Sequence, residues 1–166
     1  MRAIFLDRDG VLNIERGEYT YLPEDFEVIP NIIPVLQNLK HDGFKLIVIT
    51  NQAGIAKGIY TREQMNLCHD KFQTLSNYVI DDFYVACDHP SVSESLSRKP
   101  NSLMFERAIT KHNIDPTASW MVGDKERDLI PARKLNVQTV LFGDQKRTPF
   151  ADFYAEKATD LLNIIK

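Results

Sequence analysis

Two acidic residues stand one position apart where the first apolar run of the chain ends, and their spacing suggests metal and phosphate chemistry. Asp7 and Asp9 flank Arg8 and are followed by Gly10. Two buried carboxylates this close repel each other unless a cation or hydrogen-bond donors offset their charge. Carboxylate oxygens suit Mg²⁺, which leaves coordination positions open for a phosphate group.

Further polar residues follow the later apolar runs and add to this pattern. Thr50 ends the second run, Lys99 lies in the long stretch after the third, and Asp124 follows the fourth, with Asp128 four positions later. A metal ion, a lysine and a hydroxyl facing a carboxylate form a phosphoryl-transfer site, in which positioning and charge stabilisation carry most of the catalysis. One carboxylate can then act as the nucleophile through an aspartyl-phosphate.

Each of these residues alone has a simpler interpretation. An Asp-x-Asp-Gly segment is common in turns and calcium loops, but Gly10 is fourth counting from Asp7, whereas the glycine of an EF-hand loop is sixth. Thr50 alone would be a strand-end cap, Lys99 a solvated charge and Asp124 a helix N-cap. Their joint occurrence in this order, each at a strand end or in the following loop, is what indicates a site.

The elements that must position these residues alternate between strand-like and helix-like patterns. Short runs rich in Ile, Val, Phe and Tyr, several of them apolar on both faces, are typical of a covered parallel sheet. The alternation predicts an α/β fold with a doubly wound, Rossmann-like and mostly parallel sheet and no separate cap domain, in which ligands bind beyond the carboxyl ends of the strands. We expect strands at 3–6, 45–50, 82–87, 119–122 and 138–142, and helices at 32–41, 61–78, 102–112, 125–135 and 159–165.

Local signals refine these boundaries. Gly43 stands at a helix C-cap position, and Thr61 with Gln64 forms a capping-box pattern. Pro131 is tolerated best in a first turn, so we expect its helix to start late or to be kinked. The stretches 11–29 and 88–101 are too long for simple turns, and loops of that size in a compact domain are typically functional.

Composition sets the broad class of the protein. The 166 residues fit one domain, 1–166, and with 43% hydrophobic and 26% charged residues the chain can bury a core. The net charge of −3 gives no basic excess that would indicate a nucleic-acid partner. Two cysteines indicate a reducing compartment, and no apolar run approaches membrane-spanning length. We therefore expect a cytoplasmic monomer that binds neither nucleic acid nor membrane.

A resemblance to a known family rests on these motifs. Four segments resemble, in their order along the chain, the four motifs of the haloacid dehalogenase superfamily: Asp7-Arg8-Asp9-Gly10-Val11, Ile49-Thr50-Asn51, Lys99-Pro100 and Gly123-Asp124-x-x-x-Asp128. Within it, "DRDGVLN", "TNQAGIAKG" and "RKP" together resemble the D,D-heptose 1,7-bisphosphate phosphatase and histidinol-phosphatase family, and "NQAGIAKGIYT" favours the heptose branch. The resemblance runs from about residue 3 to about residue 142.

The resemblance implies a Mg²⁺-dependent phosphatase that hydrolyses a small sugar phosphate, D-glycero-D-manno-heptose 1,7-bisphosphate to the 1-phosphate, through an aspartyl-phosphate. Asp7 would be the nucleophile, and Asp9 the general acid that protonates the leaving oxygen and then the base that activates water. The residues agree with this role, because an acid two positions past a strand-end nucleophile can swing to the leaving group, and an alkoxide leaves poorly without a proton. Thr50 and Lys99 would bind the transferring phosphate.

The same resemblance implies the metal and substrate contacts. Mg²⁺ would be held by Asp7, the backbone carbonyl of Asp9 and Asp124, and Asp128 would support the metal through water. The substrate, a small phosphorylated molecule, would be contacted by Asn51, Gln52 and Arg98.

One part of the chain departs from the family pattern. Relatives often carry a zinc loop of the form Cys-x-His, a spacer and Cys-x-Cys before Arg-Lys-Pro. Here Cys87-Asp88-His89 is present, but the second half is Ser95-Leu96-Ser97. A structural zinc ion requires four good ligands and only two remain, so we expect no structural zinc.

Three alternatives stay open at this point. The enzyme alternative is a histidinol-phosphate phosphatase of the same family, which differs only in pocket residues. A phospho-accepting receiver module is a second, but there the phosphorylated aspartate follows strand three and the lysine follows strand five, whereas here those strands end at Cys87 and near Phe142. A catalytically inactive binding protein is a third, which the presence of every catalytic residue type argues against.

Overall fold

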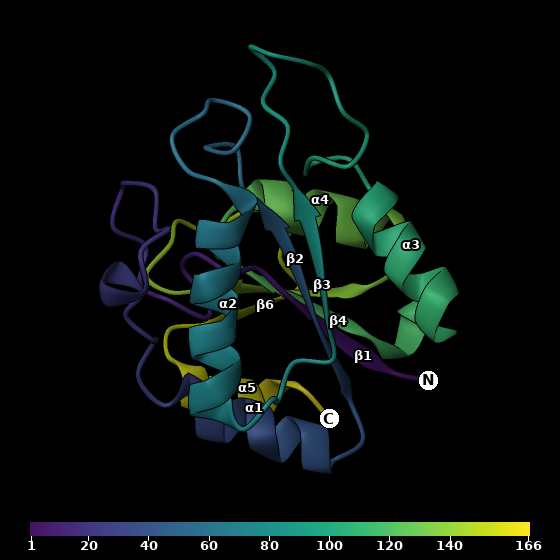
Figure 1. Cartoon of the computed structure of the whole chain (residues 1–166). Coiled ribbons are helices and arrows are strands. Elements are labelled where there is room, and N and C mark those ends of the chain that lie inside the picture. Colours follow the sequence, from purple (N-terminus) through teal and green to yellow (C-terminus); the bar gives the residue numbers. More distant parts are fainter.

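The fold is built on one sheet of six parallel strands in the order β3-β2-β1-β4-β5-β6 (Figure 1). The computed structural model describes all of residues 1–166. The strands are β1 (Ala3–Leu6), β2 (Lys45–Asn51), β3 (Asp82–Ala86), β4 (Trp120–Gly123), β5 (Gln138–Phe142) and β6 (Phe153–Ala155). The expected doubly wound α/β sheet is confirmed.

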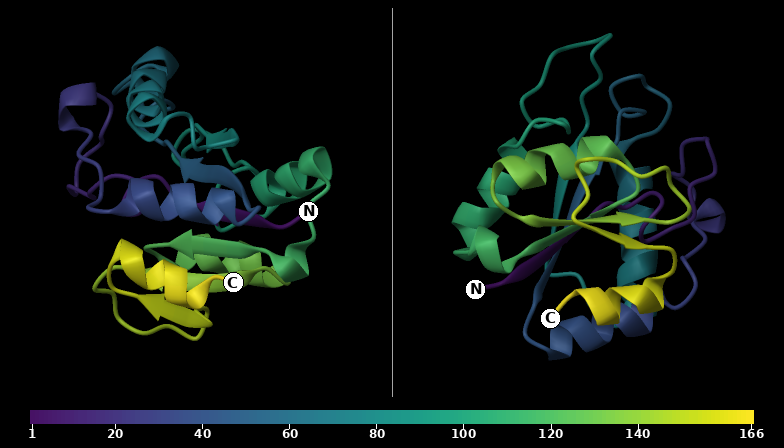
Figure 2. Two further views of the ribbon diagram at one scale, coloured as in Figure 1. Left: turned by 90° about the horizontal axis from the view of Figure 1, so that it is seen from below. Right: turned by 180° about the vertical axis from the view of Figure 1, so that it is seen from behind.

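Helices cover both faces of this sheet (Figure 2). The α-helices are α1 (Ile32–His41), α2 (Arg62–Ser76), α3 (Leu103–His112), α4 (Glu126–Lys134) and α5 (Leu161–Ile164), and short 3-10 helices lie at Pro23–Asp25, Pro116–Ala118 and Ala158–Asp160. Side chains of α1, α2 and α5 pack into one apolar cluster and those of α3 and α4 into another. None of the helices combines the length and apolar composition that crossing a membrane requires.

The first strand illustrates why the runs are apolar on both faces. Successive side chains of a strand point to opposite faces of the sheet. Ile4 and Leu6 belong to the α1–α2–α5 cluster, whereas Ala3 and Phe5 belong to the α3–α4 cluster. All four are fully buried, so β1 is the centre of both layers and fixes where the residues after it must lie.

Three expectations for the elements are corrected by the structure. Strand β6 was not expected, because it has only three residues and its first, Phe153, is exposed. Helix α4 begins at Glu126 and contains Pro131 in its interior, so it does not start late; Pro131 is buried, and packing outweighs the lost backbone hydrogen bond. The last helix splits into a 3-10 turn and the short α5.

Other local signals are confirmed. Thr61 and Gln64 form the expected capping box at the start of α2, and Gly43 follows α1 with a φ of +90°. The long segments 11–29 and 88–101 contain no helix or strand apart from one 3-10 turn and isolated bridges. Segment 88–101 leaves the sheet at the end to which β2 and β3 point, at the top of Figure 1, and segment 11–29 lies at the left of that view.

Candidate active site

The expected site residues lie where the order of the strands reverses. The chain passes from β1 to β2 and β3 on one side, then returns to β4 on the other side of β1. Asp7 directly follows β1, its backbone N–H donates to Val122 O at 3.0 Å, and Asp124 directly follows β4. Ligands of doubly wound sheets bind at this switch point.

Two glycines allow the acids to crowd together here. Gly10 has a φ of +86°, which side-chain-bearing residues rarely adopt, and a Cβ at this position would overlap the Asp124 carboxylate. A Cβ on Gly123 would overlap the side chain of Asp128. The glycines of both motifs therefore serve the close approach of the carboxylates.

A buried lysine joins two of the acids. Lys99 Nζ lies 2.9 Å from Asp7 Oδ1 and 2.7 Å from Asp128 Oδ1, and it donates to the backbone oxygen of Ile49 at 2.7 Å. All three charged side chains are buried. Burial would lower the pKa of Lys99, but the charges of Asp128 and Asp7 outweigh it and raise that pKa. Burial, followed by the charge of Asp128, raises the pKa of Asp7 to about 7.

The acids also fit a divalent cation. One carboxylate oxygen from each of Asp7, Asp124 and Asp128 lies within 4.8 Å of the other two. Asp124 Oδ1 is buried without a hydrogen-bond partner, and the other oxygen of this carboxylate pairs with Lys125 Nζ. Burial raises the pKa of Asp124. With both lysines charged and all three carboxylates ionised, the five groups carry one net negative charge, which Mg²⁺ would offset and so favour the ionised carboxylates.

Asp9 is turned away from this cluster. Its carboxylate accepts from Arg8 Nε at 3.1 Å and Nη2 at 2.8 Å, from Asn13 Nδ2 at 3.0 Å and from Gln52 Nε2 at 3.0 Å. Burial would raise the pKa of Asp9, but the charge and hydrogen bonds of Arg8 outweigh it and hold that pKa below its usual range. The carboxylate of Asp9 is therefore charged and fixed in place, and it is not part of the oxygen cluster.

The residues after β2 connect the two halves of the site. Gln52 Nε2 also donates to Thr50 Oγ1 at 3.0 Å, and both side chains are buried. The amide of Asn51 holds the backbone of Lys99, donating to its carbonyl oxygen at 3.1 Å and accepting from its N–H at 3.0 Å. Asn51 thereby fixes the segment that carries the lysine.

Asp7, Asp9, Asn51 and Gln52 line a cavity of about 660 Å³. Its wall also includes residues that the sequence did not single out for the site: Arg8, Glu15, Gly17, Glu18, Tyr19, Thr20, Tyr60, Lys125 and Arg127. Lys125 follows a predicted metal ligand directly, which is the one sequence signal that could have found it. Tyr60 lies in the segment "NQAGIAKGIYT" that carried the resemblance, but the sequence assigned it no role of its own.

Arg98 lies in the next loop rather than in the wall of this cavity. Its guanidinium donates to the backbone oxygen of Asp88 at 3.1 Å. Burial and then the positive charge of Arg127 lower the pKa of Arg98. Two guanidinium groups are therefore close enough to repel each other, and neither makes an ion pair with a carboxylate.

The residues of the incomplete zinc pattern are engaged with other partners. Cys87 Sγ accepts from Arg62 at 2.9 Å, His89 Nδ1 contacts Ser91 Oγ at 2.6 Å, and Ser95 Oγ accepts from the N–H of Ser97. These contacts describe how part of the loop is held. The expected absence of zinc stays a prediction.

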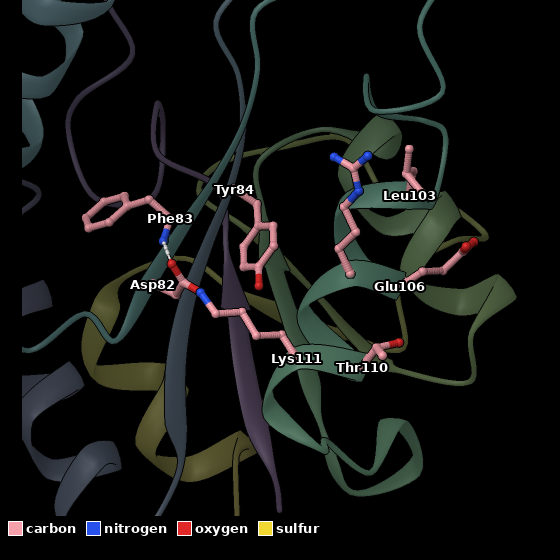
Figure 3. Close-up of a pocket in the computed structure, with 8 residues that line it drawn as sticks. Asp82, Phe83, Tyr84, Leu103, Glu106, Thr110 and Lys111 are labelled. Carbon is pink, nitrogen blue, oxygen red and sulfur yellow. Dashed lines mark hydrogen bonds and ion pairs between the residues drawn. The ribbon is translucent and has the colours of Figure 1, made fainter.

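A second cavity of about 620 Å³ lies between β3 and α3 (Figure 3). In this view Tyr84 projects from the strand toward the helix, and the Asp82 carboxylate accepts from the N–H of Phe83 at 2.9 Å. None of the expected site residues lines this cavity. The acid cluster and the residues expected to bind phosphate thus lie at the switch point and not at this second cavity.

Comparisons with known proteins agree with the fold and the motifs. The profile of haloacid dehalogenase-like hydrolases matches residues 14–142. The D-glycero-beta-D-manno-heptose-1,7-bisphosphate 7-phosphatase of Haemophilus influenzae is 37% identical over 179 residues, covering 99% of this chain and 97% of the relative. The protein of the same name from Helicobacter pylori is 34% identical over 172 residues, covering 99% and 98%.

A solved structure gives the same result for the fold. The D,D-heptose 1,7-bisphosphate phosphatase of B. bronchiseptica, crystallised with magnesium and phosphate, superposes with a TM-score of 0.89 at 24% identity and covers 99% of both chains. The chain belongs to the haloacid dehalogenase-like hydrolase family. Within that family it is a phosphatase.

Proposed function

We propose that this enzyme removes the 7-phosphate from D-glycero-β-D-manno-heptose 1,7-bisphosphate in a Mg²⁺-dependent reaction of carbohydrate metabolism. The observation that carries the proposal is the Asp7–Lys99–Asp128 cluster at the switch point, in a chain whose full-length relatives bear that activity in their names. These relatives give no support to the histidinol-phosphate alternative.

In the first step Asp7 attacks phosphorus. Lys99 and the N–H of Arg8 both contact Oδ1 of Asp7, which leaves Oδ2 without a protein donor. The new bond between this carboxylate and phosphorus forms as the bond to the sugar oxygen breaks. Asp9, which takes up a proton from solvent once it has left Arg8, gives that proton to the leaving alkoxide. Lys99 and the hydroxyl of Thr50 offset the charge of the transferring phosphate.

In the second step water releases the phosphate. Asp9, now a carboxylate, takes a proton from water, whose oxygen attacks phosphorus and frees Asp7 and inorganic phosphate. Asp9 needs to leave its contacts with Arg8 to protonate the sugar oxygen in the first step, so the bound substrate has to favour that movement.

The metal contacts follow from the oxygen cluster. Asp7 and Asp124 would hold Mg²⁺ directly with the backbone carbonyl of Asp9, and Asp128 would support it. When bound, the ion supplies a positive charge that draws the phosphate to Asp7 and stabilises charge on its oxygens. Lys125, which pairs with Asp124 in the described structure, would give up that contact to the ion.

The positive charges near the cavity support a bisphosphate as the substrate. Arg127 lies in the cavity wall without an acidic partner, and Arg98 is close enough for the two charges to interact. A second phosphate would relieve their repulsion through charge-assisted hydrogen bonds. Arg98 would then contact the remote phosphate, whereas the amides of Asn51 and Gln52 would act mainly by holding Lys99 and Asp9.

The test is a comparison of kcat/KM for the heptose bisphosphate and histidinol phosphate in the presence of Mg²⁺. We expect a large preference for the bisphosphate, and no turnover for Asp7→Asn. Asp42→Asn, which alters an exposed carboxylate beyond α1, is the matched control and keeps full activity. A preference for histidinol phosphate would overturn the substrate assignment, and turnover by Asp7→Asn would overturn the nucleophile.

The remaining properties are proposed on the same basis. We expect residues 1–166 to act as a single domain without a cap, monomeric and cytoplasmic, and without structural zinc. Light scattering of the purified protein tests the monomeric state, and metal analysis of protein purified without a chelator tests the absence of structural zinc.

A further inference from the structure

The hydroxyl of Tyr60 is joined to two candidate catalytic side chains through a single amide. It donates to Gln52 Oε1 at 2.6 Å, and Gln52 Nε2 donates to Asp9 Oδ2 and to Thr50 Oγ1, each at 3.0 Å. Tyr60, Gln52 and Thr50 are all buried. Tyr60 lies two positions before α2 and contributes nothing to the Mg²⁺ cluster.

The phenol and the Asp9 carboxylate favour the same orientation of the amide. A glutamine amide has one accepting oxygen and one donating nitrogen, and either end fits the same space. A tyrosine hydroxyl donates readily to the oxygen, which leaves the nitrogen to face Asp9 and Thr50. With the amide reversed, its oxygen would face the carboxylate of Asp9 and repel it.

The ring that carries this hydroxyl is held on both sides. It lies so close to Gly54 that a Cβ there would overlap the ring. On another side it stacks on Tyr21, with centroids 5.1 Å apart and planes 7° from parallel. Burial raises the pKa of Tyr60, so the hydroxyl keeps its proton and its role as a donor.

We propose that Tyr60 is a positioning residue of the phosphatase reaction, whose hydroxyl orients the Gln52 amide so that it holds the carboxylate of Asp9. The inference rests on the proposed function for the role of Asp9. Arg8 donates to both oxygens of that carboxylate and Asn13 donates to Oδ1, whereas Gln52 adds a second donor to Oδ2 from the segment after β2. The Tyr60 hydroxyl thereby helps to set the position from which Asp9 moves to the leaving group.

Tyr60→Phe tests this by removing the hydroxyl and keeping the ring. Two substrates are compared: an alkyl phosphate, whose leaving oxygen needs a proton, and p-nitrophenyl phosphate, whose leaving group departs without one. We expect kcat/KM to fall about tenfold for the alkyl ester, which corresponds to about 1.4 kcal/mol, and less than about twofold for the aryl ester. The ratio of the two values does not depend on the folded fraction, so a loss of stability alone leaves it unchanged.

Two further variants separate the hydroxyl from the ring. Tyr21→Phe removes the hydroxyl of the stacked neighbour, for which the structure gives no hydrogen bond, and leaves the ratio at the wild-type value. Gly54→Ala displaces the Tyr60 ring while leaving its hydroxyl, and lowers the ratio in the same direction as Tyr60→Phe. Equal losses on both esters in Tyr60→Phe would overturn the proposal and place the effect on phosphate binding through Thr50. Wild-type ratios in Tyr60→Phe would overturn it as well.

A spectroscopic measurement keeps this test separate from that of the proposed function. The side-chain NH₂ resonances of Gln52 in ¹⁵N spectra report its hydrogen bonds without any turnover. We expect them to shift in Tyr60→Phe and to stay in place in Tyr21→Phe. Unchanged resonances in Tyr60→Phe would overturn the relay, whereas absence of all phosphatase activity in the wild type would overturn only the proposed function.

Discussion

Replacing Lys99 by methionine should destabilise the protein and abolish its activity. The substitution keeps most of the apolar side chain but removes the ammonium group that lies 2.9 Å from Asp7 and 2.7 Å from Asp128. Both carboxylates are buried, with exposed fractions of 6% and 0%, so water cannot replace the lost charge. The Ile49 carbonyl loses its donor too.

The magnitude follows from these contacts. Removing one partner of a buried ion pair costs about 3 to 5 kcal/mol, because the remaining charge is left without a partner. Two carboxylates are left here, but the pKa of Asp7 is already about 7, so this group can take up a proton and discharge itself. The cost then falls mainly on Asp128 and the carbonyl, and we expect a loss of about 3 to 5 kcal/mol in the free energy of unfolding.

Urea unfolding at pH 7 in EDTA, followed by circular dichroism, measures this loss for Lys99→Met, Asp128→Asn and the double variant. The double variant should be more stable than the sum of the single losses predicts, by about 2 kcal/mol, because neutralising Asp128 removes the unpaired charge. Lys134→Met, at an exposed position of α4, is the matched control. A loss below about 1 kcal/mol for Lys99→Met, or additive losses in the double variant, would refute the reasoning.

Three further outcomes are expected. Burial lowers the pKa of His69 to about 3 from 6.5 in the unfolded chain, so between pH 3 and 6.5 the unfolded chain alone binds this proton. Stability should therefore fall as the pH drops below 6.5, by about 2 kcal/mol at pH 5. In thermal melts His69→Phe should remove this pH dependence, whereas His41→Asn, at an exposed site, should keep it. Gly123→Ala should cost about 1 to 3 kcal/mol of stability and most of the activity, because the added Cβ would overlap the side chain of Asp128. Wild-type melting and wild-type activity in this variant would contradict that overlap. EDTA should abolish turnover, and activity that survives complete metal removal would contradict the metal site. In titration calorimetry Asp124→Asn should raise the Kd for Mg²⁺ at least about tenfold.

Much of the fold follows from local sequence patterns. Each observed strand except β6 matches an apolar run from which a strand was predicted, because a strand covered on both faces must be apolar on both faces. Boundaries marked by caps, such as Thr61 at the start of α2, were accurate because the capping side chain acts on its own backbone. Strand β6 was missed, and the late start expected for the helix that contains Pro131 was wrong, because burial against distant residues decides both.

The candidate site, like the fold, was predicted from the sequence only in part. The sequence alone determined that Asp7, Thr50 and Asp124 meet at one edge of the sheet, because each directly follows or ends a parallel strand and the carboxyl ends of parallel strands share an edge. Lys99 was anticipated from its order in the chain. Gly10 was visible as a motif residue, but its overlap with Asp124 was not.

Only the tertiary structure decided how these side chains pair. It joins Lys99 to Asp7 and Asp128, turns Asp9 toward Arg8, and connects Tyr60 to the site through an amide. Side-chain torsions and contacts between separate loops set these pairings, and neither is encoded in local spacing. A strand end places a backbone within a few ångströms, whereas hydrogen bonds and ion pairs depend on the last ångström, which the packing of the whole chain determines.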